Sequence, residues 1–476
     1  MLGEHNKELA KFCVDFAIKN RADYADARII KSDEESYMLK NGTPESAVFS
    51  ESIGIGFRVL VNGGMSFLSI NNLHKETIKK RILESIKSAK VAGKKNKNKI
   101  KLSEEKTYKD KWKIDEKIKL MDVSPEEKMK YLIDIEKSLS HLKKNLISRF
   151  FQLLSGTTEK FYVNNEGTEI SSYIPQIFMF YSLIAVNGKD SEQRYYPVGE
   201  SGGWEIIKKW NINDKIKNDA EMLVKILKEA KPAKKEMQDI ILSPELVGIA
   251  MHESCGHPGE ADRTLGREAA QAGETYVTPQ LIGTRIGNNV VTVVDDPTVE
   301  NSFGFYKYDD EGVPAQRRML IKNGTLNGFL HNRETASVFG VKSNGASRAS
   351  DYNRESIVRM STTFMLPGNH SFEELLEDVK YGIFIKTYNE WNIDDKRYNA
   401  KYTGGETYRI ENGELKGLLR APKLEIQTPT FYSSIDALSK KVEFISGTCG
   451  KNEPMDGVPV WMGGPYARLR KIPIGS

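Results

Sequence analysis

Cysteine is scarce in this chain of 476 residues, which has only three: Cys13, Cys255 and Cys449. An odd and widely spread set of cysteines excludes the disulfide framework of small secreted domains. It suits a reducing compartment, where a cysteine is kept for packing or for binding a metal. Histidine is also rare, with seven residues, so two histidines close together in the sequence stand out.

Long apolar runs are absent as well. No stretch reaches the roughly 20 apolar residues that span a bilayer, and charged residues interrupt the N-terminal segment, which therefore has no secretory hydrophobic region. We expect a cytoplasmic protein without a membrane partner. A formal net charge of only +5 does not favour a nucleic-acid partner. The lysine-rich segment 89–119 mixes Lys with Glu and Asp, and we interpret it as solvated surface rather than as a basic binding arm.

The length of the chain predicts two domains. Residues 1–231 alternate helical and β-strand periodicity and include a Lys-rich helical segment, which predicts a mixed α/β domain. Residues 236–476 contain one clear helix among many short strands, so we expect an α+β protein with a β-rich C-terminal domain. Two segments of this domain, 321–330 and 410–419, resemble each other, and each places Asn-Gly at the tip of a hairpin.

The strongest chemical signal is the hexapeptide HESCGH, which begins at His252 and ends at His257. Ser243-Pro244 is a helix start, so a helix should lead into the hexapeptide. In the common zinc helix the histidines are four residues apart and about 40° around the axis, whereas a spacing of five gives roughly 140°. A π-bulge would bring them together, and so would a helix end at Pro258. We expect His257 at or just past the last turn, because proline disfavours the α region for the preceding residue.

Two histidines do not complete a catalytic zinc site, which takes three protein ligands and leaves one position for water. Cys255 is close in the sequence, and Cys449 lies in a turn bracketed by glycines. The residues alone therefore leave open which of the two cysteines is the third ligand. A structural zinc is disfavoured because structural sites usually have four ligands. Glu253 ends the apolar stripe of the helix, and a carboxylate there requires a metal, a proton or a cation as its partner.

These segments carry a family resemblance, since the chain resembles the TldD/PmbA family of metallopeptidases, in particular its TldD-like members. The matching stretches are GIGFRVLVNGGMSFLSI at 54–70, HESCGHPGEAD at 252–262, LNGFLHNRETA at 326–336, SNGASRA at 343–349, VRMSTTFMLPGNHSFEELLEDVKYGIF at 358–384 and GTCGKNEPMDGVPVWMGGPYARLR near the C-terminal end. The resemblance implies zinc on His252, His257 and Cys449, with Glu253 as the general base. It also implies a homodimer, or a heterodimer with a paralogue that lacks the metal motif.

The function we expect is that of a zinc-dependent peptidase acting on unfolded proteins or peptides, in which Glu253 takes a proton from the water that zinc activates. A second donor for the developing oxyanion could be His331, Arg333 or Arg359. The β-rich C-terminal half suggests that substrate adds as a strand to a sheet edge. The segment 387–394 lacks the glycines that we expect of the family, which leaves substrate preference open. The alternatives are a non-catalytic modulator or binding subunit of a TldD/PmbA-type complex, and an amidase acting on small modified peptides.

Overall fold

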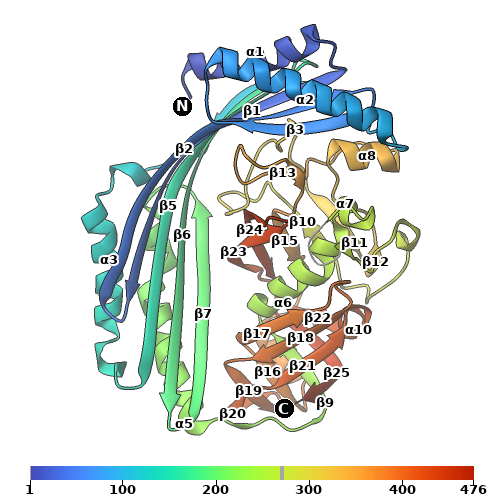
Figure 1. Ribbon diagram of the computed structural model, residues 1–476. Coiled ribbons are helices and arrows are strands. Elements are labelled where there is room, and N and C mark those ends of the chain that lie inside the picture. The colour runs from blue at the N-terminus through green and yellow to red at the C-terminus, as the bar shows by residue number, and fades with distance from the viewer. Residues whose placement is uncertain (1, 269–272, 476) are drawn as a thin grey trace.

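The computed structural model describes residues 2–268 and 273–475. A long curved N-terminal sheet arches over a C-terminal part that contains two larger sheets and a short β-ladder (Figure 1). Helices and strands are mixed in both parts, which confirms the predicted α+β class. Within the described ranges, no helix is both long enough and apolar enough to cross a membrane.

The N-terminal sheet has seven strands in the order β3-β2-β1-β5-β6-β4, with β7 paired to β6. Buried side chains alternate with partly buried ones along most of β5 and β6, as expected for strands that have one face against an apolar core. The strands of this sheet are β1 (Tyr24–Lys40), β2 (Thr43–Val61), β3 (Gly64–Ile70), β4 (Lys109–Lys113), β5 (Leu146–Asn164), β6 (Glu169–Asn187) and β7 (Asp190–Ser201).

Helices cover the outer face of this sheet at both of its ends (Figure 1). They are α1 (Glu4–Lys19), α2 (Lys75–Lys95), α3 (Pro125–Ser138), α4 (Ile206–Trp210) and α5 (Ile212–Glu229). The helix α2 buries Ile78 and Ile82 against the sheet, while all lysines from Lys87 to Lys99 are exposed. This exposure agrees with the interpretation of the Lys-rich region as solvated surface. Cys13 lies on the buried face of α1 and belongs to the apolar core between this helix and the sheet.

The C-terminal part holds a six-stranded sheet, a ten-stranded sheet and a short β-ladder. The six-stranded sheet has the order β12-β11-β10-β15-β24-β23, so β23 is an edge strand. Its strands are β10 (Val293–Asp295), β11 (Arg318–Lys322), β12 (Thr325–Leu326), β15 (Thr362–Met365), β23 (Glu443–Lys451) and β24 (Asp456–Gly464). The ladder joins β13 (Ser347–Arg348) to β14 (Ile357–Val358).

The ten-stranded sheet has the order β17-β18-β21-β25-β9-β16-β19-β20-β8, with β22 paired to β25. Its strands are β8 (Lys231–Pro232), β9 (Glu236–Leu242), β16 (Tyr381–Ile385), β17 (Tyr388–Ile393), β18 (Asn399–Gly404), β19 (Thr407–Glu411), β20 (Glu414–Arg420), β21 (Lys423–Gln427), β22 (Ile435–Leu438) and β25 (Ala467–Gly475). The helices of the C-terminal part are α6 (Pro244–Met251), α7 (Ala261–Thr264), α8 (Arg333–Phe339), α9 (Phe372–Glu377) and α10 (Thr428–Ser434).

The helix α6 contacts β9 of the large sheet and β15, β23 and β24 of the smaller one. Glycines permit this close packing: a Cβ added to Gly248 would lie 2.9 Å from the backbone nitrogen of Gly463. A Cβ on Gly464 would lie 2.4 Å from Cγ1 of Val247. Because the helix and the sheet approach this closely, the C-terminal end of α6 is brought beside β23.

The two similar segments are hairpin turns of the same kind. Asn323 and Gly324 have φ values of 47° and 76°, and Asn412 and Gly413 have 49° and 76°, which confirms the positive φ predicted for an Asn-Gly turn. The first turn joins β11 to β12 and the second joins β19 to β20, in different sheets.

The apolar cores support a division of the chain near residue 232. The largest core takes its buried residues from 233–474, whereas two N-terminal cores take theirs from 2–227. The chain is not unstructured where the two predicted domains meet, because Lys231–Pro232 pairs with β20 as strand β8. The division into 1–231 and 236–476 stays a prediction.

Candidate metal centre

The chain leaves α6 through a widened turn. Ser243 is the N-cap residue of the helix, although its side chain makes no capping hydrogen bond. A π-helical segment, His252–Gly256, follows α6, and the His257 N–H donates to the carbonyl of His252 five residues earlier. Of the two devices that could compensate for the five-residue spacing, the structure therefore contains the π-turn.

His257 departs from one expectation. Its φ and ψ are −59° and −46°, so the prediction that Pro258 would force it out of the α region is wrong. The hydrogen bond to the His252 carbonyl holds the backbone of His257 in place. Pro258 lies at the beginning of a short 3₁₀ turn, His257–Gly259, where its missing N–H removes no helical hydrogen bond.

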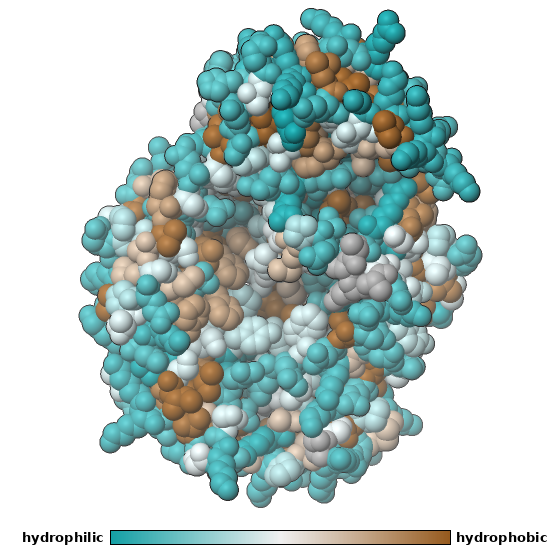
Figure 2. All heavy atoms as spheres, viewed as in Figure 1, coloured by the Kyte–Doolittle hydropathy of each residue, from teal (hydrophilic) through white to brown (hydrophobic). Residues whose placement is uncertain are grey.

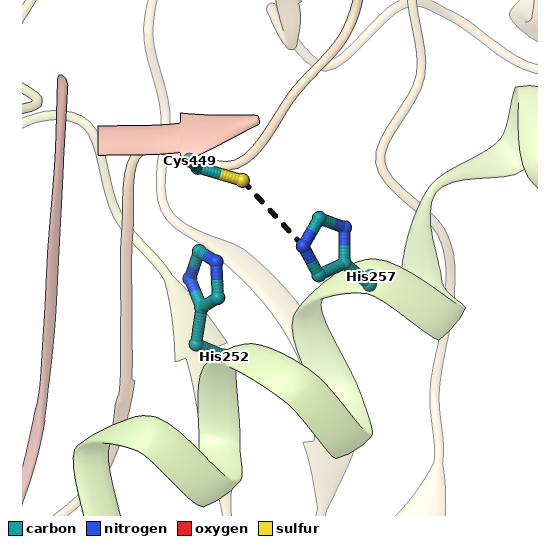
Figure 3. Close-up of side chains that lie close together, drawn as sticks. All are labelled: His252, His257 and Cys449. Carbon is teal, nitrogen blue, oxygen red and sulfur yellow. Dashed lines mark hydrogen bonds between the residues drawn. The ribbon is translucent and has the colours of Figure 1, made fainter. Parts of the chain in front are cut away.

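The π-turn brings His252 and His257 to one side, facing Cys449 on β23 (Figure 3). The prediction that Cys449 lies in a turn is wrong, because the strand continues through it and pairs with β24. One potential ligand atom from each of the three residues lies within 4.8 Å of the other two. The Nε2 of His257 is 3.5 Å from Sγ of Cys449. The centroids of the two imidazole rings are 5.0 Å apart, and the ring planes meet at an angle of 80°. A nitrogen and a sulfur that bind one tetrahedral zinc ion, at bond lengths of about 2.1 Å and about 2.3 Å, would be about 3.6 Å apart. The structure thus brings together the three residues that the family resemblance implied.

The environment of these side chains fits a divalent metal with nitrogen and sulfur ligands. All three residues are buried, and burial lowers the pKa of both histidines, which favours the neutral imidazole that binds metals. The Nδ1 of His252 is buried without a hydrogen-bond partner among the described residues. Two imidazoles and a thiolate form a set that zinc accepts. Together the three residues supply the three protein ligands that a catalytic zinc site uses.

The cysteine of this group is also the more acidic of the two nearby thiols. Burial alone would raise the pKa of Cys449, but His257 and Arg359 outweigh it and lower the pKa to about 7. Burial raises the pKa of Cys255 well above its usual range. Cys255 is absent from the one group of potential metal ligands found in the described part of the chain.

The three candidate oxyanion donors lie in different surroundings. Arg359 is completely buried beside the site, and its guanidinium donates to the carbonyls of Cys449 and Asp456. Arg333 instead binds Glu166 and the carbonyl of Ser103 in the N-terminal part.

The ring of His331 makes its contacts with residues outside the three grouped side chains. Its Nδ1 lies 3.2 Å from Oγ1 of Thr335, and its ring packs against Phe329 and Phe339. Of the three candidates, only Arg359 contacts the backbone of a grouped residue. The roles proposed for His331 and Arg333 at the site stay predictions without contacts that support them.

Two neighbours of the site were not identified from the sequence. Arg397 forms a buried ion pair with Glu253, and is thus the cationic partner that the carboxylate requires. Burial raises the pKa of Glu253 although Arg397 and His252 oppose the shift. Glu260 accepts a hydrogen bond from Nδ1 of His257 at 3.0 Å. Glu260 carries a local signal that could have identified it, because a carboxylate three residues after a ligand histidine can face its second nitrogen.

Comparisons with known proteins cover nearly the whole chain. Residues 25–89, 118–231 and 234–476 match, in order, domain 1, the central domain and the C-terminal domain of the PmbA/TldA metallopeptidases. A metalloprotease of Methanocaldococcus jannaschii is 36% identical over 450 residues, which are 94% of this chain and 96% of the relative. A zinc metalloprotease TldD homolog of Saccharolobus solfataricus is 29% identical over 352 residues, 74% of this chain and 76% of that protein.

Two solved structures share the fold at low sequence identity. TldE from Thermococcus kodakarensis superposes with a TM-score of 0.75 at 18% identity, and the match covers 99% of both chains. A Thermotoga maritima protein, described as a candidate modulator of a DNA gyrase, gives a TM-score of 0.76 at 17% identity, covering 98% of this chain and all of the other. At these identities the two structures show the architecture alone.

Proposed function

We propose that this chain, which belongs to the PmbA/TldA metallopeptidase family, is a zinc-dependent peptidase that hydrolyses peptide bonds of unfolded proteins or extended peptides. The observation that carries the proposal is the grouping of His252, His257 and Cys449 around one point beside Glu253. Two neutral imidazoles and a thiolate would hold the ion and leave a fourth position free.

The chain's own residues supply the remaining chemistry. Zinc, when bound, polarises a carbonyl and lowers the pKa of water. Glu253 is the general base in this proposal: it takes a proton from water and passes it to the leaving amine. Arg397 fixes the direction in which the Glu253 carboxylate points. Arg359, through its contact with the Cys449 carbonyl, holds the part of β23 that carries the thiolate.

The surroundings of β23 support an extended substrate. β23 is the edge strand of its sheet, so a peptide could pair with it as an added strand. A cavity of about 380 Å³ lies between the concave face of the N-terminal sheet and Thr448 of β23. A second one, of about 260 Å³, shares Thr448 and Pro459 with it. The surface of the molecule is hollowed between its two parts (Figure 2).

These cavities lie on the face of β23 opposite the metal group, since Thr448 and Cys449 are neighbours on a strand and point to opposite sides. The site itself is buried, with Glu253 only 5% exposed. A substrate bound along the strand edge would therefore reach the metal group around that edge. Folded proteins could not take this path, which is why we propose unfolded chains or peptides as substrates.

The test compares purified wild-type protein with Glu253→Gln. Both should contain about one zinc ion per chain, because Glu253 is not a ligand in this proposal. Cleavage of a denatured protein should fall about 10²- to 10⁴-fold in the variant, since the general base is lost. Equal cleavage by the two proteins would refute the mechanism. Zinc binding by the wild type without any cleavage would favour the non-catalytic modulator instead.

A pair of cysteine variants tests the ligand set. Cys449→Ala should lose zinc, and Cys255→Ala, a matched control in which another buried thiol is removed, should retain it. The reverse result would make Cys255 the third ligand.

The family resemblance also predicts a dimer, with a second copy or with a paralogue lacking the metal motif. Light scattering of the purified chain measures whether it associates by itself.

A further inference from the structure

A fully buried lysine connects the two segments that carry the proposed ligands. Lys451 follows Cys449 by two residues on β23, so both side chains point to the same face of the strand. The side chain of Lys451 has no exposed surface. Its Nζ lies 2.7 Å and 2.9 Å from the two carboxylate oxygens of Asp262, and it also donates to the Val358 carbonyl at 2.8 Å.

The carboxylate partners of this ammonium group all come from the segment that follows His257. Besides Asp262, the Nζ lies 3.3 Å from Glu260 and 3.8 Å from Glu268. An ammonium group without water is costly unless carboxylates compensate its charge, and three carboxylates surround this one. Glu268 makes a further connection, because it accepts a hydrogen bond from the backbone N–H of Asn452 at 2.9 Å.

Glu260 connects Lys451 to the imidazole of His257. Its Oε2, the atom facing Lys451, also lies 3.0 Å from Nδ1 of His257. A carboxylate accepts hydrogen bonds and cannot donate them, so Nδ1 of His257 carries the proton. The Nε2 is then left with its lone pair, and it is this atom that lies 3.5 Å from Sγ of Cys449.

We propose that Lys451 and Glu260 are positioning residues of the metal site. Glu260 fixes the tautomer and the orientation of the His257 ring, and Lys451 holds Glu260 and Asp262 against β23, so that His257 and Cys449 keep their separation. This inference rests on the proposed function, because it takes the three grouped side chains as ligands. Carboxylates that orient ligand histidines contribute about 10- to 100-fold to metal affinity in known sites.

The test measures zinc affinity by competition with a chromogenic chelator, in Lys451→Met, Glu260→Gln and wild type. Both variants should bind zinc about 10- to 100-fold more weakly than the wild type. Their Co²⁺ forms should show a shifted or weakened thiolate-to-cobalt absorption band, because the geometry at Cys449 changes. In the double variant the loss should be smaller than the product of the single losses, since the two residues act as one unit.

Lys128→Met is the matched control. Lys128 is equally buried, donates to the Leu120 carbonyl at 2.7 Å and forms an ion pair with Glu35, but it lies in the N-terminal part. Its loss should lower the thermal midpoint of the metal-free protein while leaving zinc affinity unchanged. Should Lys451→Met not fold, the isosteric Glu260→Gln decides.

Wild-type zinc affinity in both Glu260→Gln and Lys451→Met would overturn the inference and leave the proposed function intact. An equal loss of affinity in Lys128→Met would also overturn it, since the effect would then be one of general stability. A wild-type protein that binds no zinc at all would overturn the proposed function, and the inference with it.

Discussion

The buried ion pair between Glu253 and Arg397 combines a stabilising and a functional role in two side chains. Their side chains are 7% and 5% exposed. Removing one member of such a pair costs about 3–5 kcal/mol, because the other charge is left buried and uncompensated. Arg397 also has a φ of 62°, a conformation that is uncommon for residues other than glycine and that occurs often at functional sites.

Breaking this pair should reveal the coupling between the two residues. We expect Arg397→Met and Glu253→Gln each to lower the free energy of unfolding of the metal-free protein. The double variant should lose less than the sum, with a coupling of about 2 kcal/mol. Urea unfolding of the four proteins measures this. Arg81→Met, which removes an exposed pair with Glu84, is the control and should change stability by about 0.5 kcal/mol or less. Strict additivity would contradict the prediction.

His331 should make stability depend on pH. Burial lowers its pKa to about 4, whereas an unfolded histidine has a pKa of about 6.5. The unfolded chain therefore gains a proton as the pH falls below about 6.5, while the folded chain stays neutral at this ring. The contribution of His331 is fully present above that pH and is lost towards about pH 4, with a loss of about 2 kcal/mol near pH 5.

The variant His331→Asn removes this titration. Urea unfolding at about pH 7.5 and about pH 5 should show that the difference in stability between wild type and variant shrinks by about 2 kcal/mol at the lower pH. Other groups titrate equally in both proteins, so the comparison isolates His331. A difference that does not depend on pH would contradict the prediction.

Single residues also mark the limit of what the sequence could predict about the site. The scarcity of histidine identified His252 and His257, and family resemblance selected Cys449 over Cys255. Arg397 and Lys451 could not be found in this way, because their carboxylate partners lie 144 and 189 residues away in the sequence. An ion pair between distant segments leaves no local pattern, since each charge alone looks like solvated surface.

At the scale of one element, the π-turn depends on a glycine. The start of α6 at Ser243-Pro244 was predictable from capping chemistry, whereas the five-residue histidine spacing left two geometries open. The structure contains the π-turn, and Gly256 lies within it. A Cβ added to Gly256 would lie 1.9 Å from Sδ of Met360 and 3.3 Å from Oγ1 of Thr363. A larger residue would therefore displace the turn or the methionine.

Gly256→Ala should destabilise the protein by about 1–3 kcal/mol through overpacking and should weaken zinc binding, because His252 and His257 flank the displaced turn. Adding Met360→Ala should restore part of both losses, since it removes the obstructing side chain. Gly417→Ala is the control, because Gly417 is exposed and its added Cβ meets no atom within 4 Å. Thermal unfolding and chelator competition measure the two effects. Unchanged zinc affinity in Gly256→Ala would contradict the role of this packing.

At the scale of the whole molecule, ion pairs connect the N-terminal part to the C-terminal part. Arg333 pairs with Glu166, Arg58 with Glu311 and Lys160 with Asp310.

The alternation of apolar and polar residues predicted the strands, and the Asn-Gly pairs predicted the turns. Neither pattern predicted that the two similar hairpins would belong to different sheets. Strand pairing and the curvature of the long sheet depend on contacts between distant segments, so they could not be predicted from local periodicity.

The cavity between the two parts leads to the last prediction, which separates substrate access from metal binding. Thr448 lines both cavities, whereas Cys449 faces the metal group. Thr448→Trp should fill this space and raise the KM for a denatured-protein substrate about tenfold, because binding is lost while the reacting groups are untouched. Its zinc content should not change. Leu415→Trp, placed on an exposed hairpin, is the control and should retain the wild-type KM. If Thr448→Trp also retained it, the peptide would have to reach the site by a path that avoids these cavities, and binding along the edge of β23 would have to be abandoned.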